Sequence, residues 1–102
     1  MARRLIWSNL VEFQKKEIYK YWNQRNKSNE YSRKLDLLFT EVAELLLKKP
    51  LIGTKTSRKD VRLIIVRDYL MFYKVTRETI QILIIWDSRR DPQDLKELTQ
   101  KL

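Results

Sequence analysis

Two groups of basic side chains in this chain are of the residue types that can act on a phosphate. Six of them lie between Lys48 and Arg62, against the single acid Asp60: Lys48, Lys49, Lys55, Arg58, Lys59 and Arg62. Arg89 and Arg90 form a second group near the C-terminus. Such side chains stabilise charge that develops on phosphate, so they can support metal-free RNA cleavage by the substrate's own 2′-hydroxyl. The same basic surface can also bind an acidic partner without any reaction.

The composition excludes most other chemistries. The chain contains no histidine and no cysteine, which removes the commonest general base, the commonest metal ligand and any thiolate or disulfide. Its carboxylates are scattered, and its one glycine cannot form a glycine-rich phosphate loop. We therefore expect no metal site and no cofactor.

The net charge of +9, from 22 basic and 13 acidic residues, favours a polyanionic partner. Nucleic acid, an acidic protein segment and an anionic membrane surface all have this character, and the alternative is that the charge only keeps the protein soluble. Concentration of the charge between residues 48 and 62 favours a binding face. The longest apolar run, residues 82–86, is too short to cross a bilayer, and no secretory signal is evident. We expect a soluble cytoplasmic protein without a membrane partner.

The first half of the chain predicts a strand followed by a helical hairpin, within one domain that spans residues 1–102. The strand is expected at Arg3–Trp7, with Ser8 as the N-cap of a first helix that ends near Arg25. A polar turn at residues 26–29 leads into a second helix over Glu30–Lys49, which Pro50 stops. Two long helices joined by so short a turn are expected to pack antiparallel.

The second half predicts a sheet. Residues 51–59 form a loop in which Gly53 is expected to have a positive φ. Strands are expected at Val61–Val66, Tyr69–Val75 and Thr79–Trp86, joined by hairpin-length links, and the apolar third strand should be central and covered on both faces. A last helix is expected from Pro92 to about Leu102. The fold class is α+β, in the order β-α-α-β-β-β-α, with helices against one mainly antiparallel sheet.

Several of these side chains also have plain structural interpretations. Arg62 can bridge to an acid such as Asp87, and the two arginines at 89 and 90 can lie in a solvated turn. The tryptophans are expected in the core or on the sheet, and among the strand aromatics one tyrosine, Tyr69 or Tyr73, is the candidate to face a cleft.

Four segments in order carry a resemblance to a known family. They are PLIG at residues 50–53, Arg62 at the start of a strand, DYLMFYKV at residues 68–75 and IIWDSRRDP at residues 84–92. Together they resemble the RelE/ParE superfamily of bacterial toxins, over essentially the whole chain. These are the growth-inhibiting toxin halves of type II toxin–antitoxin pairs, often described as plasmid stabilisation proteins.

The resemblance implies a hetero-oligomer with a cognate acidic antitoxin that covers the helices and a sheet face. RelE-like members cut messenger RNA on the ribosome, and this pattern makes Arg62, Arg89 and Arg90 catalytic candidates. It places Lys55, Arg58 and Lys59 in the basic loop that binds RNA or a partner, together with Tyr69 and Tyr73.

The sequence departs from the RelE-like pattern because no tyrosine or histidine follows Trp86. ParE-like members lack the catalytic residues and inhibit DNA gyrase, so gyrase inhibition is the first expectation. Ribosome-dependent RNA cleavage, with Tyr69 or Asp91 replacing the missing group, is the alternative. A third possibility is a toxin-like binding module without toxicity.

Overall fold

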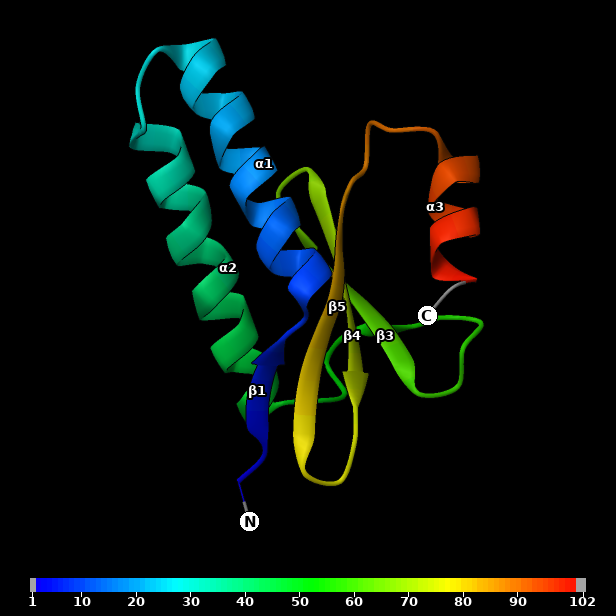
Figure 1. The fold of residues 1–102 in the computed structure, drawn as a ribbon. Coiled ribbons are helices and arrows are strands. Elements are labelled where there is room, and N and C mark those ends of the chain that lie inside the picture. Colours follow the sequence, from blue (N-terminus) through cyan, green and yellow to red (C-terminus); the bar gives the residue numbers. More distant parts are fainter. Residues whose placement is uncertain (1, 101–102) are drawn as a thin grey trace.

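The helical hairpin covers one face of a five-stranded sheet, and a short C-terminal helix covers the other (Figure 1). The computed structural model describes residues 2–100. Its elements are β1 (Arg4–Trp7), α1 (Asn9–Asn26), α2 (Glu30–Lys48), β2 (Thr54–Lys55), β3 (Val61–Val66), β4 (Tyr69–Val75), β5 (Thr79–Asp87) and α3 (Pro92–Thr99). The strand order is β1-β5-β4-β3-β2, antiparallel throughout except for the parallel pair β1–β5. The predicted α+β class and its mainly antiparallel sheet are confirmed.

Ser8 fixes both the start of α1 and its position on the sheet. Its Oγ accepts a hydrogen bond from the Val11 N–H at 3.0 Å, as an N-cap residue does, and donates one to the Leu83 carbonyl at 3.0 Å. At the other end, Lys27 adopts the left-handed conformation (φ 51°), which ends α1.

The main core lies between the hairpin and the sheet. The apolar stripe of α2 contributes Leu35, Phe39 and Leu46, all of them buried. They pack against sheet residues of β4 and β5 in one cluster, which includes Tyr69, Met71, Tyr73, Ile80 and Ile82. A smaller cluster on the opposite face contains Val61, Phe72, Ile84 and Trp86, with Leu95 and Leu98 of α3 packed against it.

An irregularity in β5 changes which of its residues face each side of the sheet. Phe72 pairs with Ile84 but Tyr73 pairs with Ile82, so one extra residue, Leu83, stands in β5 at this point. Ile82 and Ile85 then belong to the hairpin-side core, whereas Ile84 belongs to the cluster under α3. Coverage of this strand on both faces is as predicted, although β4 and not β5 is the middle strand.

The structure corrects the predicted loop before β3. A two-residue strand, β2, lies inside it, and the prediction that Gly53 has a positive φ is wrong, because no glycine in the described chain has one. Gly53 is needed for a close approach instead: a Cβ atom there would lie 2.5 Å from the Tyr73 hydroxyl oxygen and 2.7 Å from the Leu63 carbonyl oxygen. The predicted end of the last helix, residues 101–102, lies outside the described residues.

Candidate functional site

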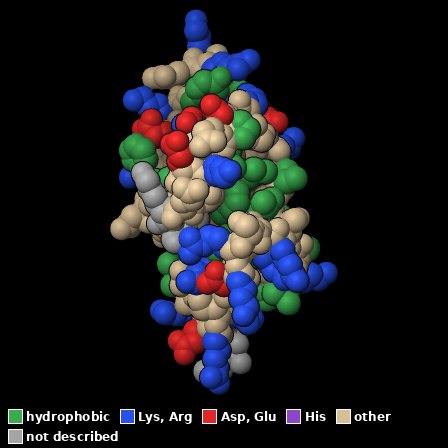
Figure 2. Space-filling view, turned by 90° about the vertical axis from the view of Figure 1, so that its right-hand side faces the viewer, with side chains coloured by type: hydrophobic (Ala, Val, Ile, Leu, Met, Phe, Trp, Pro, Cys, Tyr) green, Lys and Arg blue, Asp and Glu red, His purple; other side chains and the backbone are tan. Residues whose placement is uncertain are grey.

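Basic side chains gather around β2 and the loop that follows it. Lys55, Arg58 and Lys59 are exposed, and Lys55 pairs with Arg62 across the β2–β3 ladder. The nearby acid, Asp60, forms an ion pair with Lys74 at 3.3 Å, and hydrogen bonding to Lys74 lowers the pKa of this carboxyl. Figure 2 shows Lys and Arg side chains gathered over the lower half of the face that carries α3, with few acids among them.

Arg62 is directed at the protein backbone. One guanidinium nitrogen, Nη1, donates to the Gly53 carbonyl at 2.8 Å and to the Leu51 carbonyl at 3.2 Å. The alternative in which Arg62 bridges to Asp87 is wrong, because Asp87 is bound by Arg89 near the other end of the sheet. Arg62 therefore supports the loop before β2.

Tyr73 holds the same loop from the interior of the protein. Its side chain is completely buried, and its hydroxyl accepts from the Gly53 N–H at 2.9 Å while donating to the Pro50 carbonyl at 2.8 Å. Burial raises the pKa of this phenol above its ordinary value of 10.0. In this conformation the Tyr73 side chain does not reach a binding surface.

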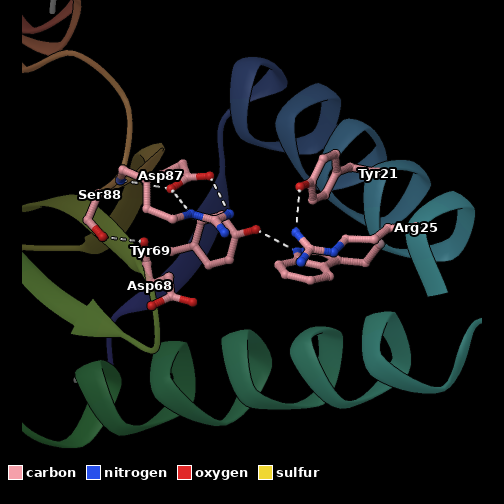
Figure 3. A network of polar contacts seen from close by, with 8 residues as sticks. Tyr21, Arg25, Asp68, Tyr69, Asp87 and Ser88 are labelled. Atoms are coloured by element: carbon pink, nitrogen blue, oxygen red, sulfur yellow. Dashed lines mark hydrogen bonds and ion pairs between the residues drawn. The ribbon is translucent and has the colours of Figure 1, made fainter.

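A second polar cluster lies where β5 ends beside α1 (Figure 3). Arg89 binds Asp87 with two hydrogen bonds, from Nε at 2.9 Å and from Nη2 at 2.8 Å. This hydrogen bonding lowers the pKa of the Asp87 carboxyl. The Arg89 guanidinium also lies 5.6 Å from the centre of the Trp22 ring. The indole N–H of Trp22 donates to the buried Tyr69 hydroxyl at 2.8 Å, and burial raises the pKa of Tyr69.

Arg62 does not come together with the other two catalytic candidates, Arg89 and Arg90. Arg62 faces Tyr73 on β4, whereas Asp87, the partner of Arg89, faces Tyr69. These two positions are four residues apart along β4, which corresponds to about 13 Å along the strand. Arg90 lies 4.5 Å from the centre of the Trp86 ring, on the face that α3 covers. Arg62 therefore lies apart from Arg89 and Arg90, which lie near each other beyond the end of β5, and the three are not arranged around one phosphate.

A groove of about 580 Å³ runs between α1 and the end of β5. Phe13, Tyr21 and Leu10 form its α1 side, and their exposed fractions are 61%, 47% and 38%. Arg89 and Arg90 lie at its β5 side. An apolar groove with a basic end fits a segment that carries both apolar and acidic side chains.

The described residues hold no group of three or more acidic side chains placed to share a metal ion. Within the same part of the chain, no helix combines the length and the apolar character that crossing a membrane requires.

Comparison with known proteins identifies the family. Residues 5–92 match the sequence model of the family described as ParE toxin of type II toxin–antitoxin system, parDE. The chain belongs to the ParE toxin family. Among solved structures, this ParE-family chain is similar to one described as the chromosomal ParDE TA system from P. aeruginosa, with 19% identity and a TM-score of 0.71. That similarity covers 82% of this chain and 94% of the other, and it supports the fold. A search of curated proteins finds no match.

The family match ends at residue 92, so most of α3 lies beyond the segment that defines this chain as ParE-like. The α1 groove was not predicted from the sequence. Its signal is present: Leu10, Phe13 and Tyr21 recur at spacings of three and eight residues on one side of a helix whose buried side is elsewhere.

Proposed function

We propose that this chain is the toxin of a type II toxin–antitoxin module that acts in the cytoplasm by inhibiting DNA gyrase and is neutralised by an acidic antitoxin. Membership of the ParE family gives the class of protein. The observation that carries the gyrase mechanism over RNA cleavage is the separation of Arg62 from Arg89 and Arg90 along the sheet.

The two candidate tyrosines support the same choice. An RNA-cleaving site needs a group that takes a proton from the 2′-hydroxyl or gives one to the leaving oxygen. Burial raises the pKa of both Tyr69 and Tyr73, and both hydroxyls already have partners inside the protein. They are poorly suited to act as a base near neutral pH.

The groove between α1 and β5 is the surface we propose for the antitoxin. A partner segment that buries Phe13, Tyr21 and Leu10 would remove three exposed large apolar side chains from water. Its carboxylates would meet Arg90 at the end of the groove, since Arg89 is already paired with Asp87. The result is a hetero-oligomer in which the groove is covered and the toxin is held inactive.

One observation favours the second candidate function, RNA cleavage on the ribosome. Lys55 at the end of β2 and Arg58 and Lys59 on the loop that follows are all exposed, and such a basic segment is suited to bind phosphates of RNA. In that case the ribosome would supply the groups that the toxin lacks. A toxin-like module without toxicity is the third candidate, and a chain that fails to arrest growth when induced would support it.

The experiment that separates these functions is controlled induction in a bacterium with parallel pulse labelling by thymidine and methionine. Inhibition of gyrase predicts that thymidine incorporation falls first, because blocked supercoiling stops replication before translation. A collapse of methionine incorporation before that of thymidine would contradict the proposal and favour messenger RNA cleavage.

Variants of the second arginine group test the absence of catalysis. We expect Arg89→Gln and Arg90→Gln to keep growth arrest, because neither side chain acts on a bond in the target. Loss of one charge-stabilising group from a catalytic site typically lowers the rate by a factor of about 10² to 10³. Growth arrest measured by colony counts after induction would therefore disappear in these variants if the chain cleaved RNA through them.

A further inference from the structure

The loop Pro50–Gly53 presents two neighbouring aliphatic side chains to solvent. The exposed fraction is 65% for Leu51 and 49% for Ile52, and neither side chain belongs to a buried cluster of the protein. Isolated exposed aliphatic residues are common on protein surfaces. Two in succession on one loop make a small apolar projection whose burial would be favourable in a complex.

The backbone of this loop is held firmly from inside the protein. Tyr73 binds the Gly53 N–H and the Pro50 carbonyl, and Arg62 binds the carbonyls of Gly53 and Leu51. The Ile52 N–H donates to the Lys49 carbonyl at 3.1 Å. A loop that is already ordered loses little conformational entropy when it binds, so its apolar contacts contribute more of their energy to affinity.

The surroundings of the projection define the chemistry of its partner. Lys48 and Lys49 precede it, and Lys55 and Arg58 follow it, all four exposed. Asp60 is paired with Lys74, so the acid of this segment does not neutralise them. An acidic surface complements such a projection. Single-stranded nucleic acid is a poorer fit, because its recognition relies on aromatic side chains that stack on bases, and Leu51 and Ile52 offer none.

We propose that Leu51 and Ile52 anchor this toxin on its protein target, by entering an apolar pocket with an acidic rim. Arg62 and Tyr73 are positioning residues in this interaction, since they hold the loop and do not touch the partner. The inference rests on the proposed function, because it takes a protein and not RNA as the target. It places the target contact on the β2 side of the molecule, away from the α1 groove proposed for the antitoxin.

The test uses the double variant Leu51→Ser with Ile52→Ser in the full chain, assayed for inhibition of supercoiling by purified gyrase. Both side chains are exposed, so the fold and the melting temperature should not change. Ile65→Ser and Leu37→Ser are matched controls, because these side chains are 69% and 59% exposed at other sites. We expect the double variant to need at least about tenfold more protein for half-inhibition, as loss of an interface anchor requires, and the controls to match the unmodified chain.

Tyr73→Phe tests the positioning role. This variant removes the hydroxyl that holds the loop and keeps the ring that packs in the core. If Tyr73 acts through the loop, Tyr73→Phe weakens inhibition in the unmodified chain but causes no further loss in the double variant. Equal losses in both backgrounds would show that Tyr73 affects inhibition only through general stability.

The outcomes separate this inference from the proposed function. If the unmodified chain inhibits gyrase and the double variant inhibits it equally well, the anchor is overturned while the gyrase mechanism stands. If the unmodified chain does not affect gyrase, the gyrase mechanism fails, and growth arrest becomes the readout for the anchor. Arrest that persists in the double variant overturns the anchor; arrest lost with antitoxin binding retained supports it.

Discussion

Gly53 shows how one residue can be fixed by its neighbours and not by its own backbone angles. The Tyr73 hydroxyl and the Leu63 carbonyl leave no room for a side chain at this position. Gly53→Ala should therefore lower the free energy of unfolding by about 1–3 kcal/mol, the usual cost of adding a methyl group to a filled site. Urea denaturation followed by circular dichroism measures the change.

Thr54→Ala is the control for that substitution, since the Thr54 side chain is exposed on β2. This substitution should change the free energy of unfolding by less than about 0.5 kcal/mol. Equal stability of Gly53→Ala and the unmodified chain would show that Tyr73 can move away without loss of its two hydrogen bonds.

At the level of single residues, the sequence predicted which side chains matter better than it predicted their roles. Arg62 and Tyr73 were singled out as catalytic and binding candidates, and both turn out to brace the loop before β2. Their partners are backbone groups 9 to 23 residues away along the chain. Every residue has a backbone carbonyl, so no sequence pattern predicts which carbonyl accepts such a hydrogen bond.

Among the elements, the hairpin could be predicted because its signals are local. Ser8 caps α1, Pro50 follows α2, and the apolar stripe of α2 repeats at helical spacing. The strand β2 and the extra residue in β5 could not be predicted in this way. A two-residue strand has no periodicity, and the irregularity at Leu83 depends on which residues lie opposite each other across the sheet.

The end of α1 offers a test of its local energetics. Lys27 occupies the left-handed conformation that a side chain disfavours and glycine accepts readily. Lys27→Gly should therefore raise the free energy of unfolding by about 1 kcal/mol. Thermal unfolding measures this as a rise in the melting temperature.

Lys20→Gly is the matched control, because Lys20 is an exposed lysine in the interior of the same helix. There glycine lowers stability by about 1 kcal/mol relative to a good helix former. If both variants lowered the melting temperature, the strain attributed to Lys27 would be absent.

For the whole molecule, the absence of histidine and cysteine predicts an unusual pH profile. No side chain has an ordinary pKa between about pH 5 and 8, so stability should be flat across that range. Burial raises the pKa of Tyr19, Tyr69 and Tyr73 above the ordinary value of 10.0, and a hydrogen bond to Asp36 adds to the effect on Tyr19. The folded protein then holds these protons more tightly than the unfolded chain, so stability is complete below pH 10 and falls as the pH rises above it.

At acid pH, stability changes with pH in the opposite direction. Arg89 lowers the pKa of Asp87 from its ordinary value of 3.8, so this contribution is present above pH 3.8 and is lost as the pH falls through the lowered value. Melting temperatures from pH 3 to 11 at constant ionic strength give the profile. A marked step between pH 5 and 8 would contradict it.

The charge of the whole molecule fits a protein that works by binding. A net charge of +9 suits both an acidic antitoxin and an acidic target surface, and the two proposed contacts lie on different parts of the fold. Binding at one need not block the other by direct overlap. The antitoxin would then neutralise the toxin either by extending over the loop or by holding it away from its target.

The most direct test of the gyrase mechanism is the supercoiling activity of purified DNA gyrase. It is measured with increasing amounts of this chain alone and of the chain mixed with its antitoxin. If gyrase is the target, the chain alone inhibits supercoiling and the antitoxin restores it. Supercoiling that continues unchanged at a large excess of a folded chain that arrests growth when induced would contradict it.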